Sequence, residues 1–210
     1  MMLITFEGPD GSGKTTQIQK LKQKLEARGY RVLVTREPGG TPMAEQIRNL
    51  LLEKREEQVF GETEMFLYAG ARAQHARGVI RPALEQGYVV LSDRYIDSSL
   101  IYQGVGRGLG IALVRLVNEA AIGGLWPQRT YLLDIGDEMA RTRMRGRAGE
   151  PDRLELEKAA FHQTIRQGYL SLQRSEPERV HLIDASRSTE VVAEEIWEDL
   201  IGLLDVRKEP

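Results

Sequence analysis

The sequence contains no cysteine and only two tryptophans, and aromatic residues make up 6% of its 210 residues. The absence of cysteine excludes disulfide bonds and thiolate metal sites, so packing must stabilise the fold. No apolar run approaches the roughly 18 residues that cross a bilayer, and no basic segment followed by a long apolar core opens the chain. We therefore expect a cytoplasmic protein without a membrane partner.

An excess of charge of one sign is also missing, because 29 basic side chains balance 31 acidic ones and the net charge is -2. This balance gives no sign of a nucleic-acid partner. A chain of this length suits one domain, since single domains commonly have about 100 to 250 residues. No repeat, low-complexity stretch or linker divides the chain, so we expect a single domain over residues 1–210.

Short apolar segments alternate with longer helical patterns along the chain. The apolar segments are rich in β-branched residues, which is typical of parallel strands buried on both faces. The alternation predicts an α/β fold in which a five-stranded parallel sheet has helices on both faces. The expected strands are 2–6, 31–35, 88–92, 130–134 and 180–183. The expected helices are one with an apolar stripe of Ile18, Leu21 and Leu25, followed by 42–53, 62–86, 111–123, 137–146, 152–174 and 189–204.

Residues 8–15, GPDGSGKT, come after the first expected strand, precede the first expected helix, and match the pattern GxxxxGK[ST]. Glycines let backbone N–H groups curl around phosphate oxygens, while Lys14 can reach β- and γ-phosphates and Thr15 can bind Mg²⁺. A glycine-rich turn that only joins strand to helix is the structural alternative. The flanking strand and helix favour a phosphate-binding loop (P-loop) of the P-loop NTPase fold.

A carboxylate ends the third expected strand at Asp93, as expected of a residue that orients Mg²⁺. Asp134 has the same form, and either residue can serve a turn instead. The residues after Asp93 distinguish the two carboxylates. Arg94 and the segment 98–103, SSLIYQ, supply donors and an aromatic ring that suit a second substrate at the carboxyl end of a parallel strand.

Arg36 comes directly after the second expected strand, and Arg94 lies just beyond the third. Each arginine alone is more typical of a surface ion pair. Together, at strand ends on the side of the P-loop, they favour an acceptor that carries a phosphate group.

The segment 141–153 contains five arginines, two acidic residues and no lysine. The planar guanidinium suits developing charge on a transferring phosphoryl group, and the glycines and proline predict a mobile lid. An RNA-binding arginine patch is the alternative, although aromatic stacking residues are missing nearby.

As a set, these residues resemble the thymidylate kinase family. The resemblance rests on the P-loop, residues 36–41 (REPGGT), Arg72, residues 93–95 (DRY), residues 102–104 (YQG) and the arginine-rich lid. Because the variable P-loop positions are not basic, it is closest to the bacterial subtype in which the lid supplies the catalytic arginine. It implies a nucleoside monophosphate kinase that transfers the γ-phosphate of ATP to dTMP with Mg²⁺, and a homodimer.

The resemblance also implies the roles of particular residues, for example Tyr68 stacking on thymine, where the family often has phenylalanine. The expected catalytic residues are Asp10, Lys14, Arg94, Arg143, Arg145 and Arg147. The expected donor-binding residues are Gly8, Pro9, Asp10, Gly11, Ser12, Gly13, Lys14, Thr15, Thr16 and Ala185. The expected acceptor-binding residues are Asp10, Arg36, Tyr68, Arg72, Arg94, Ser99, Tyr102 and Gln103. The expected Mg²⁺ ligands are Thr15 and Asp93.

Two other functions share parts of this pattern. A P-loop kinase for another pyrimidine monophosphate or for a deoxynucleoside would need the same phosphate-binding residues. A GTP-dependent switch would also need the P-loop, but the guanine-reading motif NKxD is absent from the sequence.

Overall fold

The computed structural model describes residues 2–145 and 153–206. Its centre is a sheet in the order β2-β3-β1-β4-β5, and every neighbouring pair of strands is parallel. The expected five-stranded parallel sheet is thereby confirmed. The strands are β1 (Met2–Glu7), β2 (Val32–Arg36), β3 (Val89–Asp93), β4 (Arg129–Asp134) and β5 (Val180–Asp184).

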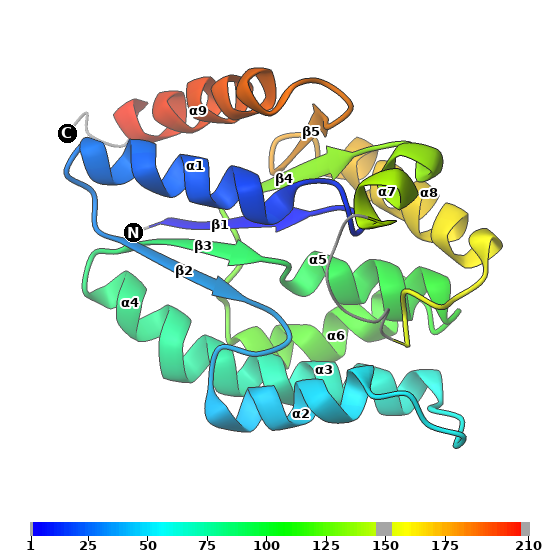
Figure 1. Cartoon of the computed structure of the whole chain (residues 1–210). Coiled ribbons are helices and arrows are strands. Elements are labelled where there is room, and N and C mark those ends of the chain that lie inside the picture. The colour runs from blue at the N-terminus through cyan, green and yellow to red at the C-terminus, as the bar shows by residue number, and fades with distance from the viewer. Residues whose placement is uncertain (1, 146–152, 207–210) are drawn as a thin grey trace.

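Helices cover both faces of this sheet (Figure 1). On one face lie α1 (Lys14–Ala27) and α9 (Thr189–Val206). On the other lie α3 (Gly61–His75), α4 (Arg81–Glu85), α5 (Ile96–Ser99), α6 (Ile111–Ile122) and α8 (Ala159–Ser175). Helix α2 (Pro42–Leu52) packs on α3, and α7 (Asp137–Arg145) comes after β4. The π-helical segments η1 (Ala76–Ile80) and η2 (Leu100–Gly106) extend α3 and α5.

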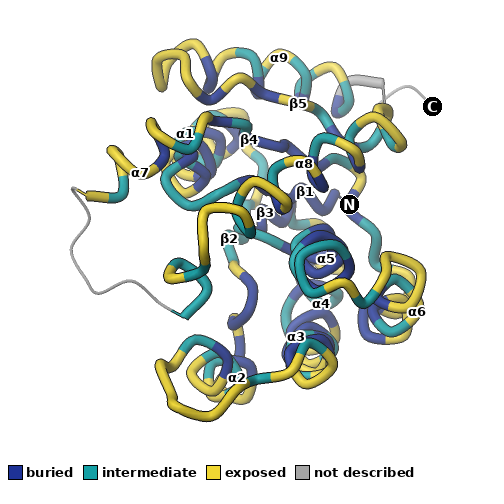
Figure 2. Tube along the Cα trace, turned by 90° about the vertical axis from the view of Figure 1, so that its right-hand side faces the viewer, coloured by how far each residue is buried: buried dark blue, intermediate teal, exposed yellow. Residues whose placement is uncertain are grey.

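The central strand β1 is buried on both faces because its side chains alternate between two hydrophobic clusters (Figure 2). Ile4 belongs to the cluster under α1 and α9, whereas Leu3 belongs to the cluster under α3, α4 and α6. The expected stripe on α1 is confirmed, since Ile18, Leu21 and Leu25 are all buried against the same face.

The sheet register places the functional strand ends side by side. Phe6 of β1 lies opposite Asp93 of β3, and Asp93 lies opposite Arg36 of β2. The P-loop and the two arginine-bearing segments therefore leave the sheet at the same edge, as the sequence predicts.

Several boundaries differ from the expected ones. The expected helix 62–86 is a continuous succession of α3, η1 and α4, whereas α8 begins at Ala159 rather than at residue 152. Residues 96–106 form α5 and η2, although no helix was expected there. Burial on both faces was wrong for the two edge strands of the sheet, β2 and β5. No residue of β2 is buried and Leu182 of β5 is 39% exposed, because each edge strand has a neighbour on one side only and is covered less completely.

No helix within residues 2–145 and 153–206 is long and apolar enough to cross a bilayer.

Candidate active site

The loop between β1 and α1 has a backbone that glycine makes possible. Gly8 and Gly11 have φ values of 129° and 80°, a region that other residues rarely adopt. A Cβ atom on Gly8 would lie 2.3 Å from the carbonyl oxygen of Leu133, and one on Gly11 would lie 2.6 Å from that of Ala140. The loop is therefore packed closely against β4 and α7, which fixes the position of its N–H groups at the start of α1.

Lys14 is buried in this loop and holds its shape. Its Nζ donates hydrogen bonds of 3.0 Å to the carbonyl oxygens of Gly8 and Pro9. The pKa of Lys14 is lowered mainly by burial and to a smaller extent by repulsion from Arg94. The carboxylate of Asp10, 3.8 Å from Lys14 Nζ, opposes this change. The ammonium group thus lies beside the loop, where a phosphate group can replace the carbonyl partners.

Two observations fit a bound nucleotide and its metal ion. The hydroxyl of Ser12 is buried without a hydrogen-bond partner in the described structure, although it lies within the P-loop. Thr15 Oγ1 donates to Asp93 Oδ2 at 3.1 Å, which places a hydroxyl and a carboxylate together. Such oxygens suit Mg²⁺, which usually takes only one or two protein ligands and keeps water or phosphate oxygens as the others. Accordingly, the described residues contain no cluster of three or more metal-binding side chains.

A cavity borders this loop between α1 and α9. Arg143 on α7 donates a 3.1 Å hydrogen bond to the carbonyl oxygen of Ala185, at the edge of the cavity. Arg187 and Gln17 also line this cavity, although neither was expected at the donor site. The expected donor-binding residues that the structure brings together here are Ser12, Gly13, Thr16 and Ala185.

Arg94 connects the P-loop to the segment after β3. Its Nη2 donates a 2.9 Å hydrogen bond to Asp10 Oδ1, and its guanidinium lies 5.6 Å from the ring centre of Tyr102. Its φ is 67°, an uncommon left-handed conformation for a residue with a side chain. Burial raises the pKa of the Tyr102 hydroxyl to about 12, so the ring beside Arg94 is uncharged at neutral pH.

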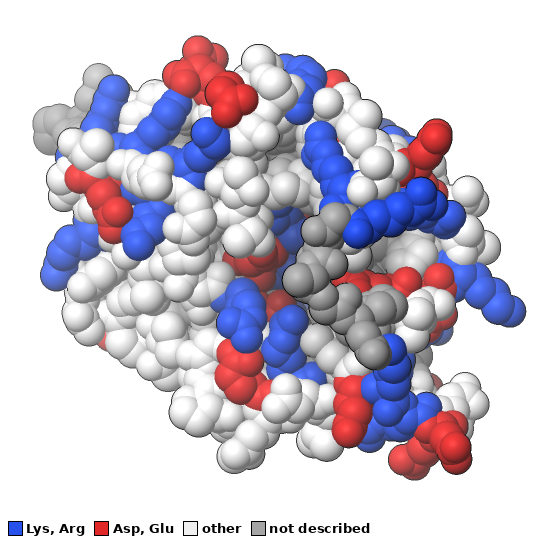
Figure 3. All heavy atoms as spheres, in the orientation of Figure 1, with Lys and Arg blue, Asp and Glu red and all other residues white. Residues whose placement is uncertain are grey.

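A cleft opens beside Arg94, between the P-loop and helices α2, α3 and η2. Figure 3, in the orientation of Figure 1, shows acidic and basic side chains close together around the middle of the molecular surface. Seven of the expected acceptor-binding residues line the cleft, namely Asp10, Tyr68, Arg72, Arg94, Ser99, Tyr102 and Gln103.

Arg36, the remaining expected acceptor-binding residue, does not line the cleft. Its side chain is 54% exposed and pairs with Glu45 at 2.8 Å. The cleft is lined instead by Arg48 of α2, which donates to the carbonyl oxygen of Pro38 at 3.0 Å. Arg48 lies within a helix and matches no motif, so only the packing of α2 could reveal it.

Arg72 is buried at the bottom of the cleft and makes an extended set of hydrogen bonds. It donates to Glu37 at 2.7 Å, to Ser99 at 2.9 Å, to the Tyr95 carbonyl oxygen at 3.0 Å, and to Asn118. These contacts use most of the N–H groups of the guanidinium. Arg72 therefore supports the fold around the cleft in addition to facing it.

The arginine-rich segment is described in part. Arg143 and Arg145 belong to the last turns of α7, and Arg145 is exposed. Arg153 donates to Glu64 of α3 at 2.7 Å, which ties the end of this segment to the helices beside the cleft. Residues 146–152, including Arg147, lie outside the described residues.

The site therefore combines a phosphate-binding loop with a second cleft that contains arginines. Residues 6–196 match the family model described as thymidylate kinase. The chain belongs to the thymidylate kinase family. The resemblance stated from the motifs is thereby confirmed, together with the phosphotransferase activity, with ATP as donor and Mg²⁺ as metal.

Curated relatives support membership of the thymidylate kinase family over most of the chain. A thymidylate kinase of Symbiobacterium thermophilum is 50% identical over 195 residues, covering 93% of this chain and 90% of the relative. One of Deinococcus radiodurans is 47% identical over 197 residues, covering 93% and 94%. A crystal structure of thymidylate kinase from Ehrlichia chaffeensis is 32% identical and has a TM-score of 0.77, covering 95% of this chain and 98% of that one.

The network around Arg72 predicts a large loss of stability on its removal. Arg72→Met leaves the buried carboxylate of Glu37 without its arginine partner, so the free energy of unfolding should fall by about 3 to 5 kcal/mol. Urea denaturation of this variant and of Arg77→Met, which changes an exposed arginine of η1, measures the difference. Equal stability of the two variants would contradict the structural role of Arg72.

Proposed function

We propose that this chain transfers the γ-phosphate of ATP to dTMP between a donor in the P-loop and an acceptor in the adjacent cleft. The position of Asp10 is the observation that supports this arrangement of donor and acceptor. The carboxylate of Asp10 lies 3.8 Å from Lys14 Nζ and 2.9 Å from Arg94 Nη2, so it joins the donor side to the acceptor side. The two substrates then meet end to end at Asp10, as in-line transfer requires.

On the acceptor side, Arg94 binds the phosphate of dTMP. Its guanidinium neutralises a group that must approach another phosphate without repulsion. Asp10 accepts a hydrogen bond from the 3'-hydroxyl of the sugar. Arg36 turns from Glu45 toward the acceptor phosphate when the acceptor is bound, since that ion pair is exposed and weak.

Tyr68, Arg72 and Gln103 select the base. The Tyr68 ring stacks on thymine, while Arg72 donates to a thymine carbonyl oxygen from the bottom of the cleft. Gln103 is buried, and its amide nitrogen donates to Glu64 at 3.2 Å, which orients it for a pyrimidine edge. Tyr102 crowds the position of a 2'-hydroxyl, and Ser99 lines the same cleft.

On the donor side, the N–H groups of residues 10–15 surround the β-phosphate, and Lys14 follows the γ-phosphate as it moves. Thr15 and Asp93 hold Mg²⁺, which when bound neutralises charge on the β- and γ-phosphates. Arg143, Arg145 and Arg147 supply the remaining positive charge from the lid at 141–153. No residue needs to remove a proton, because a monophosphate already presents an anionic oxygen.

We further propose that residues 1–210 form a single cytoplasmic domain and that the protein acts as a homodimer. Large apolar side chains are exposed on the neighbouring helices α3 and α6, where Phe66 is 61% exposed and Leu116 is 67% exposed. A second copy of the chain is the partner that would remove them from water.

An acceptor panel tests the substrate assignment. With ATP and Mg²⁺, dTMP should give a kcat/KM at least about tenfold above those of dUMP, dCMP and UMP. Arg72 disfavours cytosine, which has an amino group in place of one carbonyl oxygen of thymine, Tyr102 disfavours the ribose of UMP, and dUMP loses the apolar contact of the thymine methyl group. A higher kcat/KM for a monophosphate with another base would defeat the assignment of dTMP as the acceptor.

Lys14→Met should lower kcat by about a hundredfold or more with the fold intact, because it removes the cation of the P-loop.

Light scattering tests the dimer. Leu116→Glu places a charge on the proposed interface and should convert the dimer to a monomer at micromolar concentration. Val191→Glu is the matched control, because Val191 is 48% exposed on α9, on the opposite face of the sheet. A wild-type protein that is already monomeric, or a dimer that persists in Leu116→Glu, overturns this proposal.

A further inference from the structure

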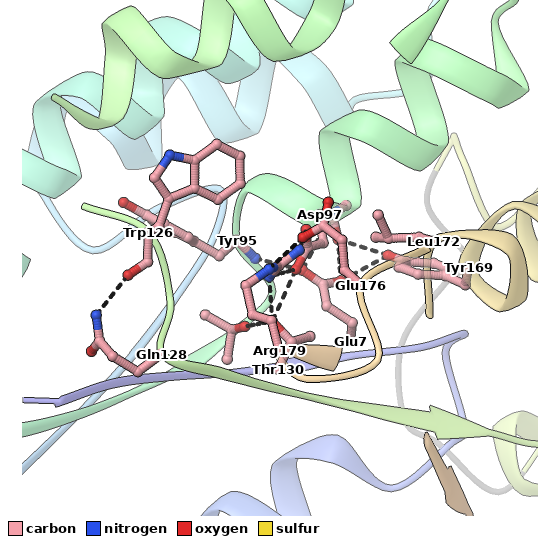
Figure 4. A network of polar contacts seen from close by, with 12 residues as sticks. Glu7, Tyr95, Asp97, Trp126, Gln128, Thr130, Tyr169, Leu172, Glu176 and Arg179 are labelled. Carbon is pink, nitrogen blue, oxygen red and sulfur yellow. Dashed lines mark hydrogen bonds and ion pairs between the residues drawn. The ribbon is translucent and has the colours of Figure 1, made fainter. Parts of the chain in front are cut away.

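Glu7, the last residue of β1, is buried and accepts several hydrogen bonds from the acceptor side of the site. Its Oε1 accepts from the backbone N–H groups of Tyr95 and Ser98, at 2.8 and 3.2 Å. Its Oε2 accepts from the Ser98 hydroxyl at 2.6 Å and from the Tyr169 hydroxyl at 2.7 Å. Glu7 thus holds the segment directly after Arg94 against the central strand (Figure 4).

The hydrogen bonds to Glu7 fix the direction in which the Ser98 hydroxyl donates. Because Ser98 and Tyr169 each donate their one hydroxyl proton to Glu7, the Ser98 oxygen is left as an acceptor. Arg94 Nη1 lies 3.4 Å from this oxygen and 4.0 Å from Glu7 Oε2. Burial and the neighbouring Asp97 raise the pKa of Glu7, while Arg94 and the two hydroxyls oppose that rise.

Tyr169 also supports Arg94 from a second direction. Its ring meets the ring of Tyr102 edge-on, with centres 6.5 Å apart and an angle of 75°. The Tyr102 ring in turn lies 5.6 Å from the guanidinium of Arg94. The hydroxyl of Tyr169 therefore contacts Glu7 and its ring contacts Tyr102, and both of these residues lie beside Arg94.

The surroundings of this group are rigid. Asp97, next to Ser98, accepts two hydrogen bonds from Arg179 at 2.7 and 2.8 Å and one from Thr130 at 2.9 Å (Figure 4). Arg166 of α8 pairs with Asp134 at 2.7 Å. Helix α5 is thus tied to Thr130 of β4 and to Arg179, directly before β5, while α8 is tied to the end of β4, so removal of one hydroxyl changes the local geometry without releasing either helix.

We propose that Tyr169 is a positioning residue for the acceptor phosphate, acting on Arg94 through Glu7, Ser98 and Tyr102. The inference rests on the proposed function, in which Arg94 binds that phosphate. Arg94 has an uncommon backbone conformation and a long side chain, so these supports keep its guanidinium at the cleft before the acceptor arrives. Tyr169 itself does not line the described cleft.

Tyr169→Phe tests this role because it removes the hydroxyl and keeps the ring against Tyr102. We expect KM for dTMP to rise about five- to tenfold, with kcat and KM for ATP changed less than about twofold. Tyr131→Phe is the matched control. Tyr131 is buried, its hydroxyl donates to Asp199 at 2.8 Å, and it lies on the α9 side of the sheet. Tyr131→Phe should lose similar stability and leave KM for dTMP unchanged.

A double-variant cycle shows whether Tyr169 acts through Arg94. In the Arg94→Ala background, adding Tyr169→Phe should leave KM for dTMP unchanged. Multiplication of the two separate effects, or an unchanged KM in Tyr169→Phe alone, overturns the inference while dTMP kinase activity of the wild type stands. A wild type that does not phosphorylate dTMP overturns the proposed function instead. If Tyr169→Phe does not fold, Tyr169→Leu, which also lacks the hydroxyl, decides by the same selective rise in KM for dTMP.

Discussion

The contact between Asp10 and Arg94 is the constraint on which the site depends. Two phosphate groups must meet in phosphoryl transfer, although each repels the other. The structure places one cation, Lys14, in the P-loop, and a second, Arg94, at the end of the neighbouring strand, with the carboxylate of Asp10 between them. Asp10 pairs with both cations and thereby holds them close together.

The sheet makes this contact possible. Strands β1 and β3 are neighbours, and the N–H of Arg94 donates to the carbonyl oxygen of Phe6 at 2.9 Å. The P-loop and the acceptor segment therefore leave adjacent strands at one level. Glu7 adds a second connection, since it belongs to β1 but accepts hydrogen bonds from the segment after β3. In the proposed function, the neighbouring strands β1 and β3 therefore set the distance between the donor and acceptor sites.

The sequence predicted the parts of this arrangement that have a local pattern. The P-loop and the strand ends at Asp93 and Arg94 were found from spacing or motif, whereas Tyr68 and Arg72 followed from the family resemblance, and the structure brings these residues together. Glu7, Tyr169 and Arg48 were missed because these three residues themselves lie outside any motif, and no periodicity reports their contacts with distant segments. Arg36 was expected in the cleft, but it pairs with Glu45 of α2, beyond the REPGGT segment that the motif marks.

The most direct measurement compares the affinities of dTMP and thymidine, which differ only by the phosphate, for the wild type and for Arg94→Ala. The account predicts that the substitution weakens dTMP binding by about ten- to a hundredfold and changes thymidine binding by less than about twofold. Isothermal titration supplies both dissociation constants. Equal losses for the two ligands, or undiminished binding of dTMP, would contradict the assignment of Arg94 to the acceptor phosphate.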